Sequence, residues 1–170
     1  ETHMDSEAQR RWLAAVPPST SYATAPYFPV HTYLFTRPDG AAVPARWIFE
    51  PTAGRVGLRG DDLLKAPDNF LDGELLSRLS QSPAEWRVLL QFPEAIDPIH
   101  NPTAAWPDSR EMLEVGRLVI DDVVDGAAGD DRDRHVFDPV RLPPGIGAAG
   151  DPIFASRSAA YAVSAQRRFA

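Results

Sequence analysis

Apolar residues alternate with polar ones in several stretches of the chain, and this alternation predicts β-strands. The predicted strands cover residues 30–35, 43–50, 87–92 and 112–120. The turn Arg37-Pro38-Asp39-Gly40 lies between the first two stretches, so we expect these strands to form a hairpin. Four strands do not close a barrel by themselves. We therefore expect their apolar faces to be covered by further strands, from a missing segment or from another chain.

Apolar residues three and four positions apart predict helices elsewhere. This spacing occurs in 61–64 and 71–79, with Pro67 between them. Near the N-terminus, Asp5 or Ser6 can cap a short helix. A last helix is predicted over 151–170, because Asp151 can act as its N-cap and Pro152 suits the first helical position.

Residues 121–150 combine an acid-rich loop with a segment from Phe137 to Gly150 that is rich in Pro and Gly. Such an irregular segment is expected to lie against something larger. At 170 residues we predict one α+β domain. Its predicted parts are an N-terminal helix (1–20), strands with inserted helices (21–120), the acidic loop and wrapping segment (121–150) and the final helix (151–170).

The net charge of -7 argues against nucleic acid or a membrane as the main partner, because both are bound by clustered Lys and Arg. The absence of Cys excludes disulfides and thiolate metal sites. No apolar stretch has the length of a membrane span or the pattern of a signal peptide, which predicts a soluble protein, with the cytoplasm favoured. Since the chain starts at Glu1, we expect a partial sequence, and a periplasmic location stays open if a leader preceded it.

Arg157 and Tyr161 lie four positions apart in the predicted last helix, so their side chains are expected to be neighbours. A guanidinium beside a phenol favours the phenolate form, which is a hard anionic ligand for ferric iron. Taken alone, the pair is more often structural. Iron binding therefore needs support from the rest of the sequence.

Five motifs supply that support, because they resemble haem catalases in order and in spacing. The motifs are Val30-His31-Thr32-Tyr33, Asn101-Pro102 with Trp106-Pro107, Leu113-Glu114-Val115-Gly116-Arg117-Leu118, Phe137-Asp138-Pro139 with Pro143-Pro144-Gly145-Ile146, and Asp151 to Tyr161. The chain resembles the second half of the catalase core, and is most similar to the small catalase-related peroxidases. The resemblance implies an antiparallel β-barrel of the catalase type, with about half of its strands in this chain.

The resemblance also implies roles for single residues. Tyr161 matches the proximal haem-iron ligand, and Arg157 matches the arginine that hydrogen-bonds its oxygen. Asp151 and His31, on a predicted strand, match the groups that hold this arginine. Without the resemblance, His31 would be interpreted as a core or surface histidine and Asp151 as a helix cap.

These roles imply a haem-dependent oxidoreductase, a catalase or peroxidase that decomposes hydrogen peroxide in defence against oxidative stress. Either a second peroxide or an organic reductant would complete its cycle. In the family, the distal histidine and its polar partner lie upstream of the matched region, and no residue here matches them. We therefore expect weak turnover from this chain alone, with a missing N-terminal half or a second chain completing the barrel. The alternative is a noncatalytic half-barrel module that binds haem or a partner chain without turnover.

Overall fold

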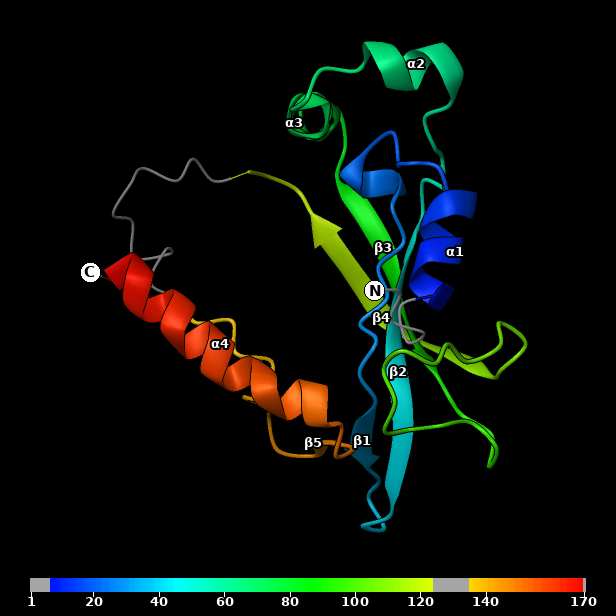
Figure 1. Cartoon of the computed structure of the whole chain (residues 1–170), viewed down its shortest axis with the longest axis vertical. Helices are drawn as coiled ribbons and strands as arrows, with labels where there is room; N and C mark the ends of the chain where they lie inside the picture. The colour runs from blue at the N-terminus through cyan, green and yellow to red at the C-terminus, as the bar shows by residue number, and fades with distance from the viewer. Residues whose placement is uncertain (1–6, 124–134, 170) are drawn as a thin grey trace. The chain divides into compact units, whose positions relative to one another are not determined.

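The computed structural model describes residues 7–123 and 135–169 (Figure 1). Its helices are α1 (Glu7–Ala15), the short 3-10 helix η2 (Tyr22–Thr24), α2 (Gly60–Lys65), α3 (Phe70–Leu79) and α4 (Pro152–Phe169). Its strands are β1 (Tyr33–Thr36), β2 (Ala42–Pro51), β3 (Ala84–Gln91), β4 (Met112–Ile120) and β5 (Ile146–Ala148). The predicted cap of the first helix at Asp5 or Ser6 lies outside the described residues.

The strands form one sheet in the order β4-β3-β2-β1-β5. β1 and β2 are antiparallel, with Tyr33 opposite Ala45, so the predicted hairpin is confirmed. β1 also pairs with β5, and β3 pairs with β4, both antiparallel. A register shift interrupts the β3–β4 ladder between Val88 and Leu89.

Two expectations need correction. The segment from Phe137 to Gly150 is not irregular throughout, because β5 lies within it and adds a fifth strand to the four predicted. The described strands form an open sheet, as expected of so few strands, which do not close a barrel by themselves. In addition, the first predicted strand begins only at Tyr33, so His31 lies just before β1 and not on it.

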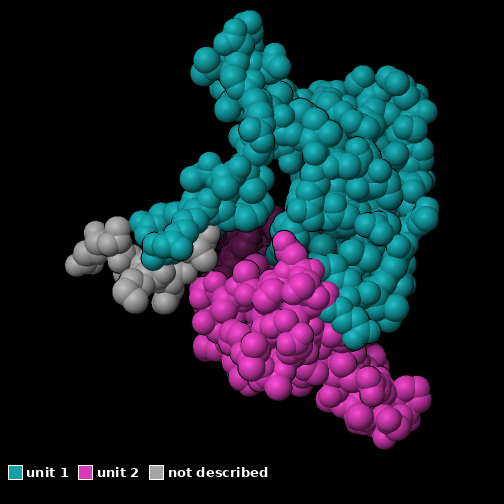
Figure 2. All heavy atoms as spheres, turned by 90° about the vertical axis from the view of Figure 1, so that its right-hand side faces the viewer, with its two compact units in different colours: residues 1–29, 47–91, 111–123 teal, residues 30–46, 92–110, 124–170 magenta. Residues whose placement is uncertain are grey.

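The contacts within the chain divide it into two compact units, shown in teal and magenta in Figure 2. The first comprises residues 1–29, 47–91 and 111–123, and the second comprises 30–46, 92–110 and 124–170. In the first unit, Ala23, Ala84 and Trp86 form a buried cluster, against which Phe49 and Leu75 pack. The indole nitrogen of Trp86 donates a hydrogen bond to the carbonyl of Ala25 at 3.0 Å, which satisfies its polar atom inside this core.

The second unit has a more polar interior. Phe154 is its largest fully buried side chain, and Thr32, His31 and Asp151 are buried as well. Because buried polar groups need hydrogen-bond partners, these residues are expected to bind one another. The residues proposed above as functional all belong to this unit.

The strand β4 has exposed side chains along almost its whole length. Its exposed apolar residues include Met112, Leu113, Val115, Leu118 and Val119. It stands at one end of the strand order, with β3 as its partner among the described strands. Among the same residues, no helix combines the length and the apolar character needed to cross a membrane.

Candidate functional site

The candidate site starts at the N-terminus of α4. The Oδ1 atom of Asp151 accepts hydrogen bonds from the backbone amides of Ile153 at 2.8 Å and Phe154 at 3.3 Å. Its carbonyl accepts from the amide of Ala155, which begins the helical hydrogen-bond pattern. Asp151 therefore has the geometry of an N-cap, and Pro152 follows where a missing N–H costs nothing.

The second carboxylate oxygen of Asp151 binds His31. Its Oδ2 atom lies 2.6 Å from Nδ1 of His31, and the two side chains are 2% and 4% exposed. Burial alone would raise the pKa of Asp151, but the hydrogen bonds from His31 and from the amides of Ile153 and Phe154 outweigh it. The pKa of Asp151 is therefore below its usual value.

The other ring nitrogen of His31 fixes the position of its proton. Nε2 lies 3.0 Å from Nη1 of Arg157. A guanidinium can only donate, so Nε2 must accept, and the ring proton must be on Nδ1. His31 is then a neutral imidazole that donates to Asp151, and their contact is a hydrogen bond rather than an ion pair.

Arg157 joins this pair to Tyr161. Its Nη2 atom donates to the phenol oxygen of Tyr161 at 3.0 Å, across one turn of α4. The structure thus brings together all four residues of the site predicted from the sequence. They form one hydrogen-bonded series, Asp151 to His31 to Arg157 to Tyr161, called the relay below.

Aromatic side chains pack beside the relay. Phe154 is 2% exposed, and its ring lies 4.7 Å from that of His31 and 5.4 Å from that of Tyr33. Burial raises the pKa of Tyr33, although the nearby charge of Arg157 acts in the opposite direction. Tyr33 is therefore held as a neutral phenol, and Tyr161 is the phenol that receives the hydrogen bond of Arg157.

Two supporting residues were not among the predicted site residues. Asp138 accepts a hydrogen bond of 2.6 Å from the hydroxyl of Ser158, the residue after Arg157 on α4. This bond and one from the amide of Val140 hold the pKa of Asp138 below its usual value, against a smaller effect of burial. Asp138 belongs to the Phe137-Asp138-Pro139 motif, which contributes to the family resemblance. Nothing in the sequence indicates that Ser158 on α4 is its hydrogen-bond partner.

The chemistry of these side chains limits which metal group they fit. Among residues 7–123 and 135–169, no group of three or more His, Cys, Asp or Glu side chains is arranged so that it could hold a metal ion. A single phenol oxygen beside a guanidinium fits a metal that brings its other ligands with it, as iron does in a porphyrin.

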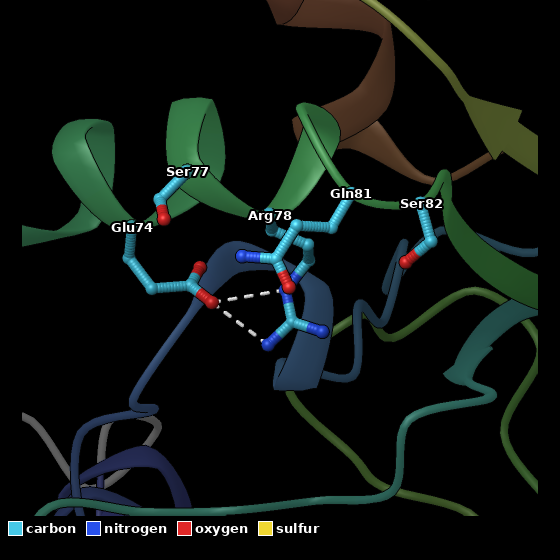
Figure 3. Close-up of a pocket in the computed structure, with 5 residues that line it drawn as sticks. All are labelled: Glu74, Ser77, Arg78, Gln81 and Ser82. Atoms are coloured by element: carbon cyan, nitrogen blue, oxygen red, sulfur yellow. Dashed lines mark hydrogen bonds and ion pairs between the residues drawn. The ribbon is translucent and has the colours of Figure 1, made fainter.

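A hollow of about 290 Å³ lies in the first unit, on α3 and the turn after it (Figure 3). It is lined by Glu74, Ser77, Arg78, Gln81 and Ser82. Oε1 of Glu74 binds Arg78 at 2.7 Å, whereas its Oε2 is buried without a hydrogen bond in the described structure. The lining is polar and contains none of the relay residues.

Comparison with known proteins finds relatives in sequence, although not through a family model. No protein-family model matches the chain. It is 34% identical over 168 residues to the catalase-related peroxidase of Synechococcus elongatus, and 30% identical over 154 residues to that of Mycolicibacterium paratuberculosis. These matches cover 99% and 87% of the chain, but 49% and 47% of the two relatives. The chain thus spans about half the length of the curated relatives it matches.

Solved structures agree in fold. A bacterial catalase superposes with a TM-score of 0.81, over 96% of this chain and 34% of that one, at 20% identity. A fungal catalase superposes with a TM-score of 0.77, over 88% of this chain and 32% of that one, at 17% identity. At this identity the likeness concerns the fold alone. Sequence and fold together identify the chain as a member of the catalase superfamily that is similar to the small catalase-related peroxidases.

Proposed function

We propose that this chain is the proximal haem-binding part of a peroxide-decomposing oxidoreductase, with the phenolate of Tyr161 as the axial ligand of the iron. The observation that carries the proposal is the relay. A ligand phenolate needs a permanent positive charge beside its oxygen, and Arg157 donates to that oxygen at 3.0 Å. The names of the relatives, catalase-related peroxidase and catalase, support hydrogen peroxide as the substrate.

Each relay residue has a definite task in this proposal. Arg157 keeps its proton, donates to the phenolate and thereby leaves the other lone pairs of the Tyr161 oxygen available for a metal. His31 accepts a second N–H of Arg157, which fixes the plane of the guanidinium. Asp151 holds the proton of His31 on Nδ1 and anchors it to the start of α4.

Haem would supply the iron at which the O–O bond of the peroxide is broken. An anionic axial ligand donates charge to the iron and lowers its reduction potential, which suits peroxide chemistry. The residues that would handle the peroxide on the opposite face, the choice of reductant and the completion of the barrel by further strands stay predictions. The names of the relatives are those of enzymes, so they do not favour the alternative of a noncatalytic half-barrel module.

Substitution of the ligand tests the proposal. Haemin is added to the chain and to Tyr161→Phe, and the visible spectra are compared. We expect a high-spin ferric spectrum for the parent and a different one for Tyr161→Phe, because phenylalanine has no oxygen to bind iron. Tyr27→Phe serves as a matched control, since Tyr27 lies in the first unit and bonds the carbonyl of Tyr22. If Tyr161→Phe and the parent give the same haem spectrum, the ligand assignment is wrong.

A further inference from the structure

Residues 135–141, called the strap below, are bound to α4 at two points. The hydroxyl of Ser158 donates to Oδ2 of Asp138 at 2.6 Å. Nη2 of Arg168 donates to the carbonyl of His135 at 3.0 Å. The strap and α4 belong to the same compact unit, so both bonds lie within it.

The two bonds determine the course of the strap. Asp138 and His135 are three positions apart, which an extended chain spans in about 10 Å. Their partners on α4 are ten positions apart, which corresponds to about 15 Å along a helix axis. The long side chain of Arg168 covers the difference. The strap therefore runs antiparallel to α4 and passes the turns that carry Tyr161 and Ala165 (Figure 1).

The burial of α4 agrees with this course. Ala165 is 4% exposed, although its neighbours in sequence on both sides are exposed. Intervals of four, three and four positions place one set of side chains on a single face of the helix, namely Phe154, Ser158, Tyr161 and Ala165. Val163, on the opposite face, is 49% exposed. The face that carries Tyr161 is thus the face that the strap covers.

Two adjacent residues of α4 have partners on two different segments. Nη1 of Arg157 binds Nε2 of His31 at 3.0 Å, and the hydroxyl of Ser158 binds Asp138 on the strap. A helix that is held at one point of a turn can still rotate about its axis. A second bond, to another segment, removes this freedom.

We propose that Asp138 is a positioning residue of the relay, which binds Ser158 and so fixes the rotation of α4 at the turn where Arg157 meets His31. The same rotation sets the direction in which the phenol oxygen of Tyr161 points. The meaning of this inference for haem binding rests on the proposed function. The effect on Arg157 can be measured without haem.

Ser158→Ala is the decisive variant. It removes the hydroxyl that binds the strap, and alanine favours the helix more than serine does. A loss of the bond between Arg157 and His31 in this variant therefore does not come from a weaker helix. Ser156→Ala is the matched control, because the hydroxyl of Ser156 donates to the carbonyl of Ile153 within α4, at 2.8 Å, and not to the strap.

Two substitutions of Asp138 separate its hydrogen bonds from its charge. In the parent, Oδ1 of Asp138 also accepts from the amide of Val140 at 3.0 Å, which shapes the strap. In Asp138→Asn, the oxygen can still accept from Val140, and the amide nitrogen can donate to the hydroxyl of Ser158. Asp138→Ala removes both bonds. We therefore expect Asp138→Asn to resemble the parent and Asp138→Ala to resemble Ser158→Ala.

The test is nitrogen NMR of the arginine side chains in the ¹⁵N-labelled chain, without haem. The signals of Arg157 are assigned from their loss in Arg157→Lys. A guanidinium that is bound at both Nη atoms rotates slowly about its C–N bonds and gives separate Nη signals, whereas a free one gives an averaged signal. We expect separate signals in the parent, Ser156→Ala and Asp138→Asn, and an averaged signal in Ser158→Ala and Asp138→Ala.

Two results would overturn the proposal. One is a Ser158→Ala chain whose Arg157 signals are as well separated as those of the parent. The other is an Asp138→Asn chain whose signals are averaged as fully as those of Asp138→Ala. Circular dichroism checks that each variant keeps its helices. If Asp138→Ala does not fold, Ser158→Ala decides the test alone.

Haemin binding gives a second measurement. We expect Ser158→Ala to keep the ferric spectrum of the parent but to bind haemin about tenfold more weakly, which is the size of one hydrogen bond to a charged group. Ser156→Ala should bind it like the parent. Provided that Tyr161→Phe alters the spectrum, equal affinities of the parent and Ser158→Ala contradict the proposal. An unaltered spectrum in Tyr161→Phe refutes the ligand assignment instead, and the NMR of Arg157 then decides the role of Asp138.

Discussion

At the scale of the residue, the two nitrogens of the Arg157 guanidinium serve two different acceptors. One binds Nε2 of His31 and the other binds the oxygen of Tyr161, each at 3.0 Å. A lysine has all its donors on one nitrogen, so it cannot span both acceptors in this geometry. The relay therefore depends on the planar shape of arginine as well as on its charge.

Asp151 gives the stability of the chain an acid dependence that can be measured. Because its pKa is lowered in the folded chain, it contributes stability above the ordinary carboxyl pKa of about 3.9, and loses it as the pH falls through the lower folded value. We expect Asp151→Asn to be less stable than the parent at neutral pH. We also expect it to lose less stability between about pH 5 and pH 2. Urea unfolding at several pH values measures both effects.

Two other carboxylates, Asp97 and Asp138, also have lowered pKa values. The stability of every variant will therefore still fall to some extent as the pH is lowered. Asp39→Asn is a suitable control, since Asp39 lies in the exposed turn between β1 and β2. Parallel pH curves for the parent and Asp151→Asn would show that the buried carboxylate contributes nothing to the acid loss.

The sequence predicted the part of the site that is local in the chain. Arg157 and Tyr161 are one helical turn apart, and Asp151-Pro152 marks a helix start, so short-range spacing was sufficient. His31 is 120 residues away from Asp151 and was placed only through the family resemblance. The bond between Ser158 and Asp138 could not be predicted, because no local pattern pairs residues 20 positions apart.

At the scale of the element, the junction before α4 depends on Gly150. Its φ of +83° is rarely adopted by other residues, and a Cβ atom there would lie 3.6 Å from Nδ1 of His100. We expect Gly150→Ala to cost about 1 to 2 kcal/mol, from the left-handed backbone. For a chain of this size that is roughly 2–4 °C of melting temperature per kcal/mol. Thermal unfolding followed by circular dichroism measures the shift.

Gly73→Ala is the matched control for that substitution. Gly73 lies within α3, has an ordinary φ and has open space around it, so alanine should raise the melting temperature slightly. Opposite signs for the two substitutions are therefore expected. A Gly150→Ala chain that is as stable as the parent would show that the junction tolerates another backbone conformation.

Most elements could be predicted because their apolar residues repeat with the spacing of a strand or of a helix. The hairpin was found from two alternating stretches and the turn at Asp39-Gly40, and β4 was placed with its observed limits. β5 was missed, because three residues that include Gly147 show no alternation. Its pairing with β1 depends on the backbone of residues far away in the sequence, which no local pattern reveals.

At the scale of the whole molecule, the exposed apolar side chains of β4 should govern association. An exposed apolar strand at the end of a sheet favours pairing with other chains. We expect Leu113→Lys/Val119→Lys to reduce light scattering of the concentrated chain, with little change in melting temperature. Leu64→Lys on α2 is the control, because Leu64 is even more exposed but lies on a helix. Equal scattering of the parent and the β4 variant would argue against this strand as the site of association.

The division into two units could not be predicted, because each unit is assembled from three separate segments. The segments of the two units alternate along the chain. Compact units of this kind can occur within one domain, so the single domain predicted from the sequence stays a prediction.

The two oxygens of Asp151 have consequences for how this protein can diverge. Oδ1 caps α4 and Oδ2 binds His31. Serine, threonine and asparagine commonly replace aspartate at helix caps. None of them offers two accepting oxygens on one side chain, so each would keep the cap and lose the bond to the imidazole. We therefore expect Ser, Thr or Asn at position 151 to be tolerated only when position 31 has changed as well. Although the two positions are 120 residues apart, their substitutions should be coupled in evolution.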